Sequence, residues 1–386
     1  MNAKIIMIYW TSLLIFLSIV YLPIQLVSIT MTGHLLVLTF PLLFLTCWKS
    51  FKKSRHFTLV MLYFAAILIS MTLVQKVSFA TFPRYASPLL IIASLEDKER
   101  KYFKPIFYLL LIFFVVNCII ALIERASLTH IISYDLDNSM FGDQVLLGEL
   151  NDNSFRSFAM LGHPLWNANI MSFMSFMFYN CFIIKRRYRI YLLILGYLSL
   201  FCFNARAAII VSTILLAPTI KNYISKSQHK TITVLMVFVC FIYFVMHFSQ
   251  IGGRLLEDGI DDGSTMVRVY SIKEFFSIPF SQLLVGGYKY QYGENGYLEI
   301  LMTYGLIVGG FKIVSELFLG FNFISNKSKV TKWIIFLSVI LIGCTNNNFN
   351  GFRVFPFYLL CLAFIENYGT SVKFCLLYTS DAADEL

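Results

Sequence analysis

The sequence predicts an all-α, polytopic integral membrane protein with about twelve transmembrane helices. Of its 386 residues, 58% are hydrophobic and only 13% are charged, and the mean hydropathy is +0.73. The surface of a soluble domain needs a larger charged share than this. The apolar runs approach the roughly 20 residues that a helix needs to cross a bilayer. The strands of a membrane barrel would instead alternate in polarity, so the spans are predicted to be helical.

In chain order, the apolar runs predict spans at 4–22, 31–48, 57–75, 77–95, 105–123, 166–184, 190–204, 206–220, 231–248, 297–320, 333–346 and 354–369. The run at 77–95 is the weakest, because it contains Pro83, Arg84 and Pro88; a broken or re-entrant segment is the alternative there. The runs at 190–204 and 206–220 are short and share one tight turn.

Basic residues set the predicted orientation. Five basic clusters separate the apolar runs, at 49–55, 97–104, 185–189, 221–230 and 326–332. By the positive-inside rule these loops and both termini face the cytoplasm. The net charge of +10 is thereby explained by topology, so no nucleic-acid partner is expected. Residues 1–374 are predicted to form one multi-pass domain.

Two long loops are predicted on the outer face, at about 124–165 and 249–296. Each carries six carboxylates together with apolar and aromatic residues, which favours ordered structure close to the membrane over a solvated linker. The periodicity of 266–278 predicts a short helix in the second loop. Function is expected on this face, because loops held by a rigid scaffold commonly carry sites.

Three arginines are candidate ligand-binding residues of the outer face. Arg206 lies in the turn between two spans, where its guanidinium either reaches the membrane interface or binds phosphate oxygens. Arg254 and Arg268 flank the acidic run 257–264 in the second loop, so pairing with its carboxylates is the alternative to ligand binding. That run lacks the ligand spacing of a calcium loop. No metal site is predicted anywhere in the chain.

His163 precedes Pro164 at the entry to the predicted span 166–184. A proline at the start of a helix is structurally ordinary. An imidazole at such a mouth could act as a base or as a donor to phosphate, because its pKa lies near neutrality; a purely structural role is the alternative. The chain has no nucleotide-binding loop lysine motif, dinucleotide fingerprint or serine-hydrolase motif, and no cofactor is expected.

Four segments occur in an order that resembles the O-antigen polymerase and O-antigen ligase superfamily. They are FRSFAMLGHPLWNANI (155–170), ARAAII (205–210), RVYSIKEFFSIPFSQLLVGGYKY (268–290) and ENGYLEILMTYGLIVGG (294–310). Members of this superfamily commonly show a Gly-His-Pro-Asn-like entry, a Ser-Arg-Gly-like turn, an Arg-led amphipathic stretch ending in Pro-Leu-x-Gly-x-Gly, and a helix with the pattern His-Asn-x-Tyr-Leu-x-x-Leu-x-x-Tyr-Gly-x-x-Gly. The resemblance covers roughly 155–310. Trp166 and Ala207 depart from the usual pattern.

The resemblance implies glycosyl transfer on the outer face of a bacterial cytoplasmic (inner) membrane, by a metal-independent enzyme similar to C-type glycosyltransferases. The donor would be an oligosaccharide on undecaprenyl diphosphate, and the product O-antigen of lipopolysaccharide, capsule or exopolysaccharide. Arg206 and Arg268 match the arginines that would bind the diphosphate leaving group, where cationic donors stabilise the developing charge. Membrane lipid, a chain-length regulator and a flippase are the partners it implies.

Glu294 occupies the position where ligases of the superfamily usually have a histidine. A carboxylate whose pKa is raised by burial could deprotonate an acceptor hydroxyl, or it could orient a sugar. The missing histidine favours a repeat-unit polymerase over a ligase. Asn295 and Tyr297, in the same polar mouth, are assigned to substrate binding, although interfacial packing is the alternative for Tyr297. A flippase or transporter is a third hypothesis; it would need midplane charges and broken helices.

The tail 375–386, CLLYTSDAADEL, differs in composition from the rest of the chain. It resembles a translated sequencing adapter, so we expect it to be a non-native end that takes no part in function. A short cytoplasmic tail is the alternative.

Overall fold

The computed structural model describes residues 3–19, 29–73, 81–94, 102–131, 155–205, 207–216, 263–288, 295–323, 329–345 and 354–368. Every regular element in these ranges is a helix, which confirms the predicted all-α class. The predicted span 231–248, most of both long loops and the tail 375–386 lie outside the described residues.

The N-terminal part contains α1 (Ala3–Ile19), α2 (Ile29–Lys52), α3 (Phe57–Leu73), α4 (Thr81–Ser94) and α5 (Lys104–Ser127). The middle contains the 3-10 turn η3 (Ala159–Leu161), α7 (Pro164–Asn180), α8 (Arg186–Cys202) and a helix at Ala207–Leu216. The C-terminal part contains α12 (Gly263–Ser277), α13 (Phe280–Val285), α14 (Gly296–Phe323), α15 (Lys329–Thr345) and α16 (Val354–Tyr368).

Three segments are long and apolar enough to cross a membrane: His34–Lys52, Lys104–Ser127 and Gly296–Asn322. Several shorter apolar helices accompany them. Large apolar side chains also point away from the protein, such as Leu45 on α2 and Ile112 on α5, which are 72% and 62% exposed. Apolar surface of this extent is rare on soluble monomers. The helices are therefore compatible with a membrane protein, and the number of twelve spans stays a prediction.

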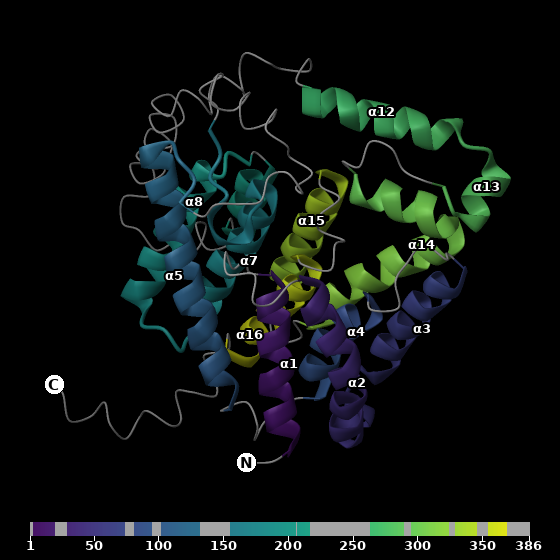
Figure 1. Cartoon of the computed structure of the whole chain (residues 1–386), viewed down its shortest axis with the longest axis horizontal. Helices are drawn as coiled ribbons and strands as arrows, with labels where there is room; N and C mark the ends of the chain where they lie inside the picture. Colours follow the sequence, from purple (N-terminus) through teal and green to yellow (C-terminus); the bar gives the residue numbers. More distant parts are fainter. Residues whose placement is uncertain are drawn as a thin grey trace.

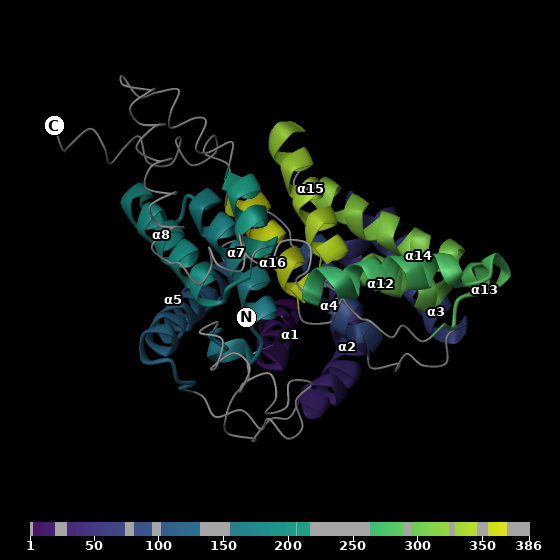
Figure 2. The ribbon, with the colours of Figure 1, turned by 90° about the horizontal axis from the view of Figure 1, so that it is seen from above.

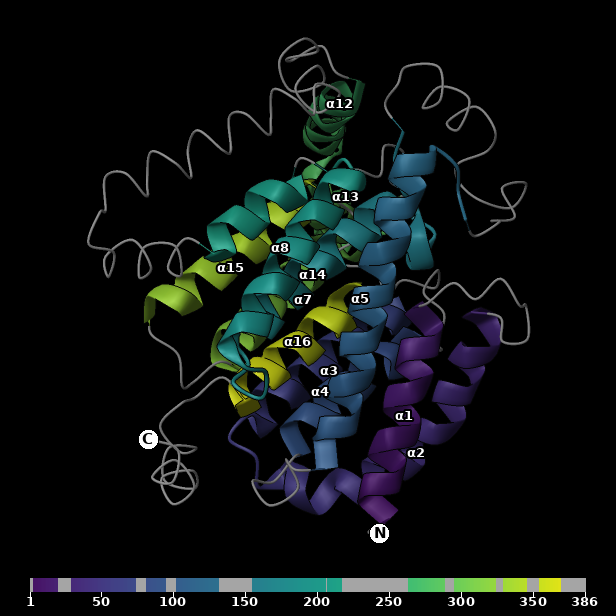
Figure 3. The same ribbon diagram turned by 90° about the vertical axis from the view of Figure 1, so that its left-hand side faces the viewer.

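The helices form two groups on either side of α15 and α16. Figure 1 shows α5, α7 and α8 on one side and α12, α13 and α14 on the other, and the view from above in Figure 2 agrees. Figure 3 shows α1 and α5 in front of α16. The middle position of α16 explains why it is buried almost along its whole length.

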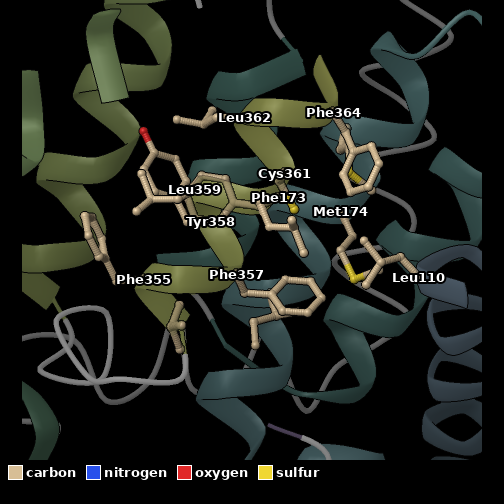
Figure 4. Packing of buried hydrophobic residues seen from close by; sticks show 14 of the residues in the cluster. Leu110, Phe173, Met174, Phe355, Phe357, Tyr358, Leu359, Cys361, Leu362 and Phe364 are labelled. Carbon is tan, nitrogen blue, oxygen red and sulfur yellow. The ribbon is translucent and has the colours of Figure 1, made fainter. Parts of the chain in front are cut away.

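Aromatic side chains fill the core where α16 meets α5 and α7. The rings of Phe173 and Tyr358 have centroids 4.7 Å apart, and those of Phe107 and Phe364 are 5.5 Å apart. Figure 4 shows this packing from close by, with Phe173 beside Tyr358. Tilted and edge-to-face ring pairs of this kind are favourable beyond the area that they bury. They join α16 to both neighbours.

One end of the helix bundle gathers the basic residues; we call it the basic end. Lys4 Nζ donates to Ser50 Oγ (2.9 Å) and to the carbonyl of Ser94 (2.8 Å), which joins α1, α2 and α4. Arg55 donates to Glu366 of α16 (2.8 Å). Phe103, in the cluster at 97–104, stacks on Phe364 of α16, and the N–H of Phe182, just before the cluster at 185–189, donates to the carbonyl of Tyr368 (2.9 Å). The described parts of the first three basic clusters thus lie at one end, and the orientation of that end in a membrane stays a prediction.

Helix α14 is broken at Gly305, which has φ 82° and ψ 162°. The span predicted at 297–320 lies within Gly296–Asn322, which is apolar and long enough to cross a membrane, but Gly305 divides it into two helical halves. The two halves of α14 meet at an angle beside α13 (Figure 1). By contrast, α4 continues through Pro88 as one helix, so the alternative of a broken helix there does not hold for the described residues. The helix predicted at 266–278 is confirmed as α12.

Candidate functional site

The segment 155–163 runs across the end of the bundle opposite the basic end, and we call it the entry segment. It leads from the first long loop into α7 and contains η3. Ala159 has φ 41° and Gly162 has φ 68°, so the chain turns sharply on both sides of η3. A non-glycine residue in the left-handed region must be held by its surroundings.

Glu124, in the last turn of α5, holds one side of the entry segment. Its Oε2 accepts hydrogen bonds from the backbone N–H groups of Phe158 and Ala159, both at 2.9 Å. Its Oε1 accepts from the N–H of Ile131 at 3.2 Å. The side chain is fully buried. Charge-assisted bonds to backbone donors are among the stronger hydrogen bonds in proteins, so this carboxylate fixes the bend around Ala159.

Two buried asparagines hold the other side. Asn117 of α5 donates through Nδ2 to Asn167 Oδ1 (2.9 Å) and accepts at Oδ1 from the N–H of Met160 (2.8 Å). Asn167 of α7 donates to the carbonyls of Phe158 (2.5 Å) and His163 (3.0 Å). Both side chains are fully buried. Satisfied buried polar networks rigidify a structure.

Further bonds join the entry segment to α5 and α8. Ser157 donates its hydroxyl to the carbonyl of Ala121 (2.8 Å) and its N–H to the carbonyl of Cys202 (3.0 Å). Arg125 donates to the carbonyl of Phe155 (2.6 Å). Side chains and backbone groups of three helices therefore fix this segment, which gives a rigid support at the mouth of α7.

His163 is the N-cap of α7. Its Nδ1 accepts from the backbone N–H groups of Leu165 (3.1 Å) and Trp166 (3.4 Å), and its ring stacks on the Trp166 indole at 4.9 Å. When Nδ1 accepts, the neutral imidazole carries its proton on Nε2. This geometry supports the alternative of a purely structural role for His163. Of the two chemical roles considered for its imidazole, it favours a hydrogen-bond donor over a base.

A second rigid contact joins the end of α13 to the break in α14. Gly286 and Gly287 have φ 82° and 85°. The N–H of Gly287 donates to the carbonyl of Thr303 (2.8 Å), and that of Tyr288 to the carbonyl of Met302 (3.2 Å). A Cβ on Gly286 would collide with the backbone of Tyr304 and Gly305. The glycines of two motifs that are distant in sequence thus touch each other.

Asn295 and Tyr297 lie at the start of α14. Asn295 Oδ1 accepts from the N–H groups of Tyr297 and Leu298, both at 3.2 Å, and so acts as the N-cap. The Tyr297 hydroxyl donates to the carbonyl of Val339 on α15 (3.1 Å). The packing alternative for Tyr297 is therefore supported in the structure, and its assignment to substrate binding stays a prediction, as does that of Asn295.

The remaining predicted site residues are only partly placed. Arg206, Arg254 and Glu294 lie outside the described residues, and of Arg268 the backbone alone is described, within α12. The entry segment and the α13–α14 contact lie on opposite sides of α15 and α16 (Figure 1). The structure therefore does not test whether these four residues meet.

Buried polar groups surround the turn that leads to Arg206. Asn204 has φ 48°, and its Nδ2 is buried with no hydrogen-bond partner among the described residues. The same holds for Nδ2 of Asn169 on α7. One turn further along α7, Ser172 donates to the carbonyl of Ala208 (3.3 Å), so α7 packs on the helix that follows the turn. Unsatisfied buried donors are uncommon and deserve a functional explanation.

Glu124 and Asn117 were not predicted from the sequence as parts of this site. A signal was present, because both lie in the apolar run of α5 and are seven residues apart, which places them on one helical face. Polar side chains in apolar spans are functional candidates. Within the described residues, no three His, Cys, Asp or Glu side chains are grouped as for a metal ion. Comparisons with protein-family models, curated proteins and solved structures give no match to this chain.

Proposed function

We propose that the protein is a membrane glycosyltransferase that joins undecaprenyl-diphosphate-linked oligosaccharide repeat units into a polysaccharide on the outer face of the cytoplasmic membrane. The observation that carries the proposal is the contact between Gly286–Gly287 and Gly305. These glycines lie within the two longest motifs of the resemblance (268–290 and 294–310), and the contact gives the glycines of both motifs one structural role. The rigid entry segment, at the end opposite the basic clusters, supports an outer-face site.

In this reaction an acceptor hydroxyl of one repeat unit attacks the anomeric carbon of another. The new C–O bond forms while the bond to undecaprenyl diphosphate breaks, and the electron pair leaves with the diphosphate. Arg206 and Arg268 would stabilise that charge, and Glu294 would take the proton of the hydroxyl. His163, with its proton on Nε2, would donate a hydrogen bond to a phosphate or sugar oxygen.

The test is the length distribution of surface polysaccharide in a deletion strain complemented with wild type, Arg206→Ala, Arg268→Ala or Glu294→Gln. We expect wild type to restore long chains and the variants to leave single repeat units on the surface. Lys273→Ala is the matched control for Arg268→Ala, because Lys273 is an exposed cation on the same helix. Equal membrane abundance of all variants is checked by immunoblot.

Other outcomes would contradict the polymerase. Long chains that remain on the lipid carrier would indicate a ligase. Loss of all surface glycan, single units included, would indicate a flippase. Long chains in all three variants would remove the three residues from the site.

A flippase or transporter is the second candidate, and the broken helix α14 favours it. Seven residues after the break, Lys312 Nζ bonds to Glu316 Oε1 at 2.6 Å, and Tyr63 of α3 donates to the same oxygen at 3.0 Å. The pair is buried and lies roughly 10–16 Å before the end of α14. Buried charges beside a broken helix are typical of transporters.

The double variant Lys312→Met/Glu316→Leu separates the two candidates. Removing one partner of a buried pair costs about 3–5 kcal/mol, whereas replacing both with apolar residues is often tolerated. A polymerase with the double variant should still make long chains. A transporter that uses the pair should leave no glycan on the surface, at unchanged abundance of the protein.

A further inference from the structure

An apolar cavity of about 230 Å³ lies between α1, α5 and α16. Its walls include Ile15 and Phe16 of α1, Ile106 and Leu110 of α5, and Phe357 of α16. All but Phe16 are buried. Figure 3 shows the three helices together, with α16 behind the other two, and Figure 4 shows Leu110 and Phe357 in the packing beside it.

The apolar lining of this cavity favours a hydrocarbon ligand. Its polar groups are Tyr9, whose hydroxyl donates to the carbonyl of Tyr102, and Ser12, whose Oγ is buried without a hydrogen-bond partner among the described residues. A water molecule needs two to four polar partners, which these walls do not offer. The cavity is also larger than the roughly 150 Å³ that accommodates benzene in an apolar protein interior.

The cavity reaches the apolar outer surface of the protein. Leu13 and Leu109 line it and are themselves 39% and 37% exposed. Nearby on the surface, Tyr108 of α5 is also exposed. The cavity therefore opens between α1 and α5 towards the apolar surface of the protein.

A cation lies next to the cavity at the basic end. Lys104 is exposed and is the first residue of α5, followed directly by the lining residues Pro105 and Ile106. Tyr102, also exposed, lies just before it. Lysine and tyrosine at the end of an apolar helix are typical of the level of lipid headgroups. The charge of Lys104 complements an anionic headgroup.

We propose that this cavity binds one acyl chain of an anionic glycerophospholipid from the leaflet at the basic end, with the headgroup at Lys104. The site is separate from the proposed glycosyl-transfer site. Ile106 and Glu124 are 18 residues apart on α5, on the order of 27 Å along the helix. The inference therefore does not depend on the proposed function.

The test uses the full chain in nanodiscs and phosphatidylglycerol that carries a diazirine at the end of one acyl chain. After photolysis, peptide mapping by mass spectrometry should place adducts on the walls contributed by α1, α5 and α16. Unlabelled phosphatidylglycerol should compete for them. Ile112 of α5, which is exposed and does not line the cavity, measures labelling by bulk lipid and should be labelled without competition.

Two substitutions at Ser12 give a matched pair. Ser12→Phe should fill the cavity and remove the wall adducts, whereas Ser12→Ala removes only the hydroxyl and should keep them. Lys104→Gln should lower labelling by the phosphatidylglycerol probe and leave labelling by a phosphatidylcholine probe unchanged. Size-exclusion chromatography checks that each variant is folded. If Ser12→Phe does not fold, the adduct map of the wild-type protein alone tests the proposal.

The proposal is overturned if wild-type walls are labelled no more than Ile112, or if folded Ser12→Phe keeps the wall adducts. Competition by undecaprenyl phosphate but not by phosphatidylglycerol would overturn the assignment to a glycerophospholipid. If Lys104→Gln lowers labelling by the phosphatidylglycerol and phosphatidylcholine probes equally, the proposed contact between Lys104 and the headgroup is overturned.

Discussion

The entry segment and the α13–α14 contact are both rigid, but the chain builds them in opposite ways. In the entry segment, three buried polar side chains, Glu124, Asn117 and Asn167, bond to backbone groups. At the α13–α14 contact, three glycines without side chains let two backbones touch and bond directly.

The two regions are therefore expected to tolerate amino-acid substitution differently. A polar network loses hydrogen bonds one at a time, and an isosteric residue can replace part of them. A backbone contact at positive φ admits no side chain at all, because both space and conformation oppose a Cβ. Substitutions in the two regions should therefore differ in how much stability a conservative replacement recovers.

Glu124→Leu should have the largest effect. It leaves the N–H groups of Phe158 and Ala159 buried without partners, at a cost of about 1–3 kcal/mol for each, and should lower the midpoint of thermal unfolding in detergent. Glu124→Gln keeps one carbonyl acceptor and should recover part of the loss. If both variants lose the same stability, the carboxylate does not act through these bonds.

Gly286→Ala should destabilise by about 2–5 kcal/mol, because a strained φ is combined with a backbone collision. Gly287→Ala has the same strain in open space and should cost only about 1–2 kcal/mol. Gly310→Ala, in open space within the helix, should be neutral or stabilising by up to about 1 kcal/mol. Detergent unfolding of the three variants measures the order, and equal losses would contradict the backbone contact.

At His163 the cap and the proposed chemistry can be separated. His163→Ala should lose the cap of α7, worth about 1 kcal/mol, whereas His163→Asn should keep it, because asparagine is a good N-cap. We expect both variants to lower the amount of long-chain polysaccharide. A wild-type amount of long-chain polysaccharide with His163→Asn would mean that His163 only caps the helix.

The last effect concerns pH at the basic end. Burial, followed by the adjacent Arg55 guanidinium, lowers the pKa of His56 from 6.5 to about 4, and Glu366 acts in the opposite direction. The unfolded chain therefore binds more protons between these values, so stability is complete above about pH 6.5 and falls as the pH drops towards 4. His56→Gln should flatten this part of the profile, measured as unfolding midpoint against pH. An unchanged slope would contradict a role for His56.

Several features were predictable because they are local. The apolar runs within the described residues are helical, and the period of 266–278 corresponds to α12, since an amphipathic or apolar pattern depends on neighbouring residues alone. The common end of the first three basic clusters is consistent with their charge placement. His163 and Asn295 were chosen for chemistry, and the structure shows that both cap helices, a role that Pro164 after His163 and the asparagine side chain at the start of an apolar run could have indicated.

The break in α14 was not predictable in this way. Gly305 lies in an uninterrupted apolar run, and a single glycine is compatible with a continuous helix. Its φ of 82° goes with a contact to Gly286 and Leu284, which lie about twenty residues earlier in the chain. The sequence offers no measure of that proximity.

Apolar helices with basic flanks are predictable from the sequence, because both properties follow from burying backbone hydrogen bonds and excluding charge from an apolar medium. The support of the entry segment by Glu124 and two asparagines, and the break of α14 against Gly286, are visible only in the folded structure. Each of these depends on atoms that folding brings together from distant parts of the chain. Hydrogen bonds and steric contacts act over a few ångströms, whatever the separation in sequence.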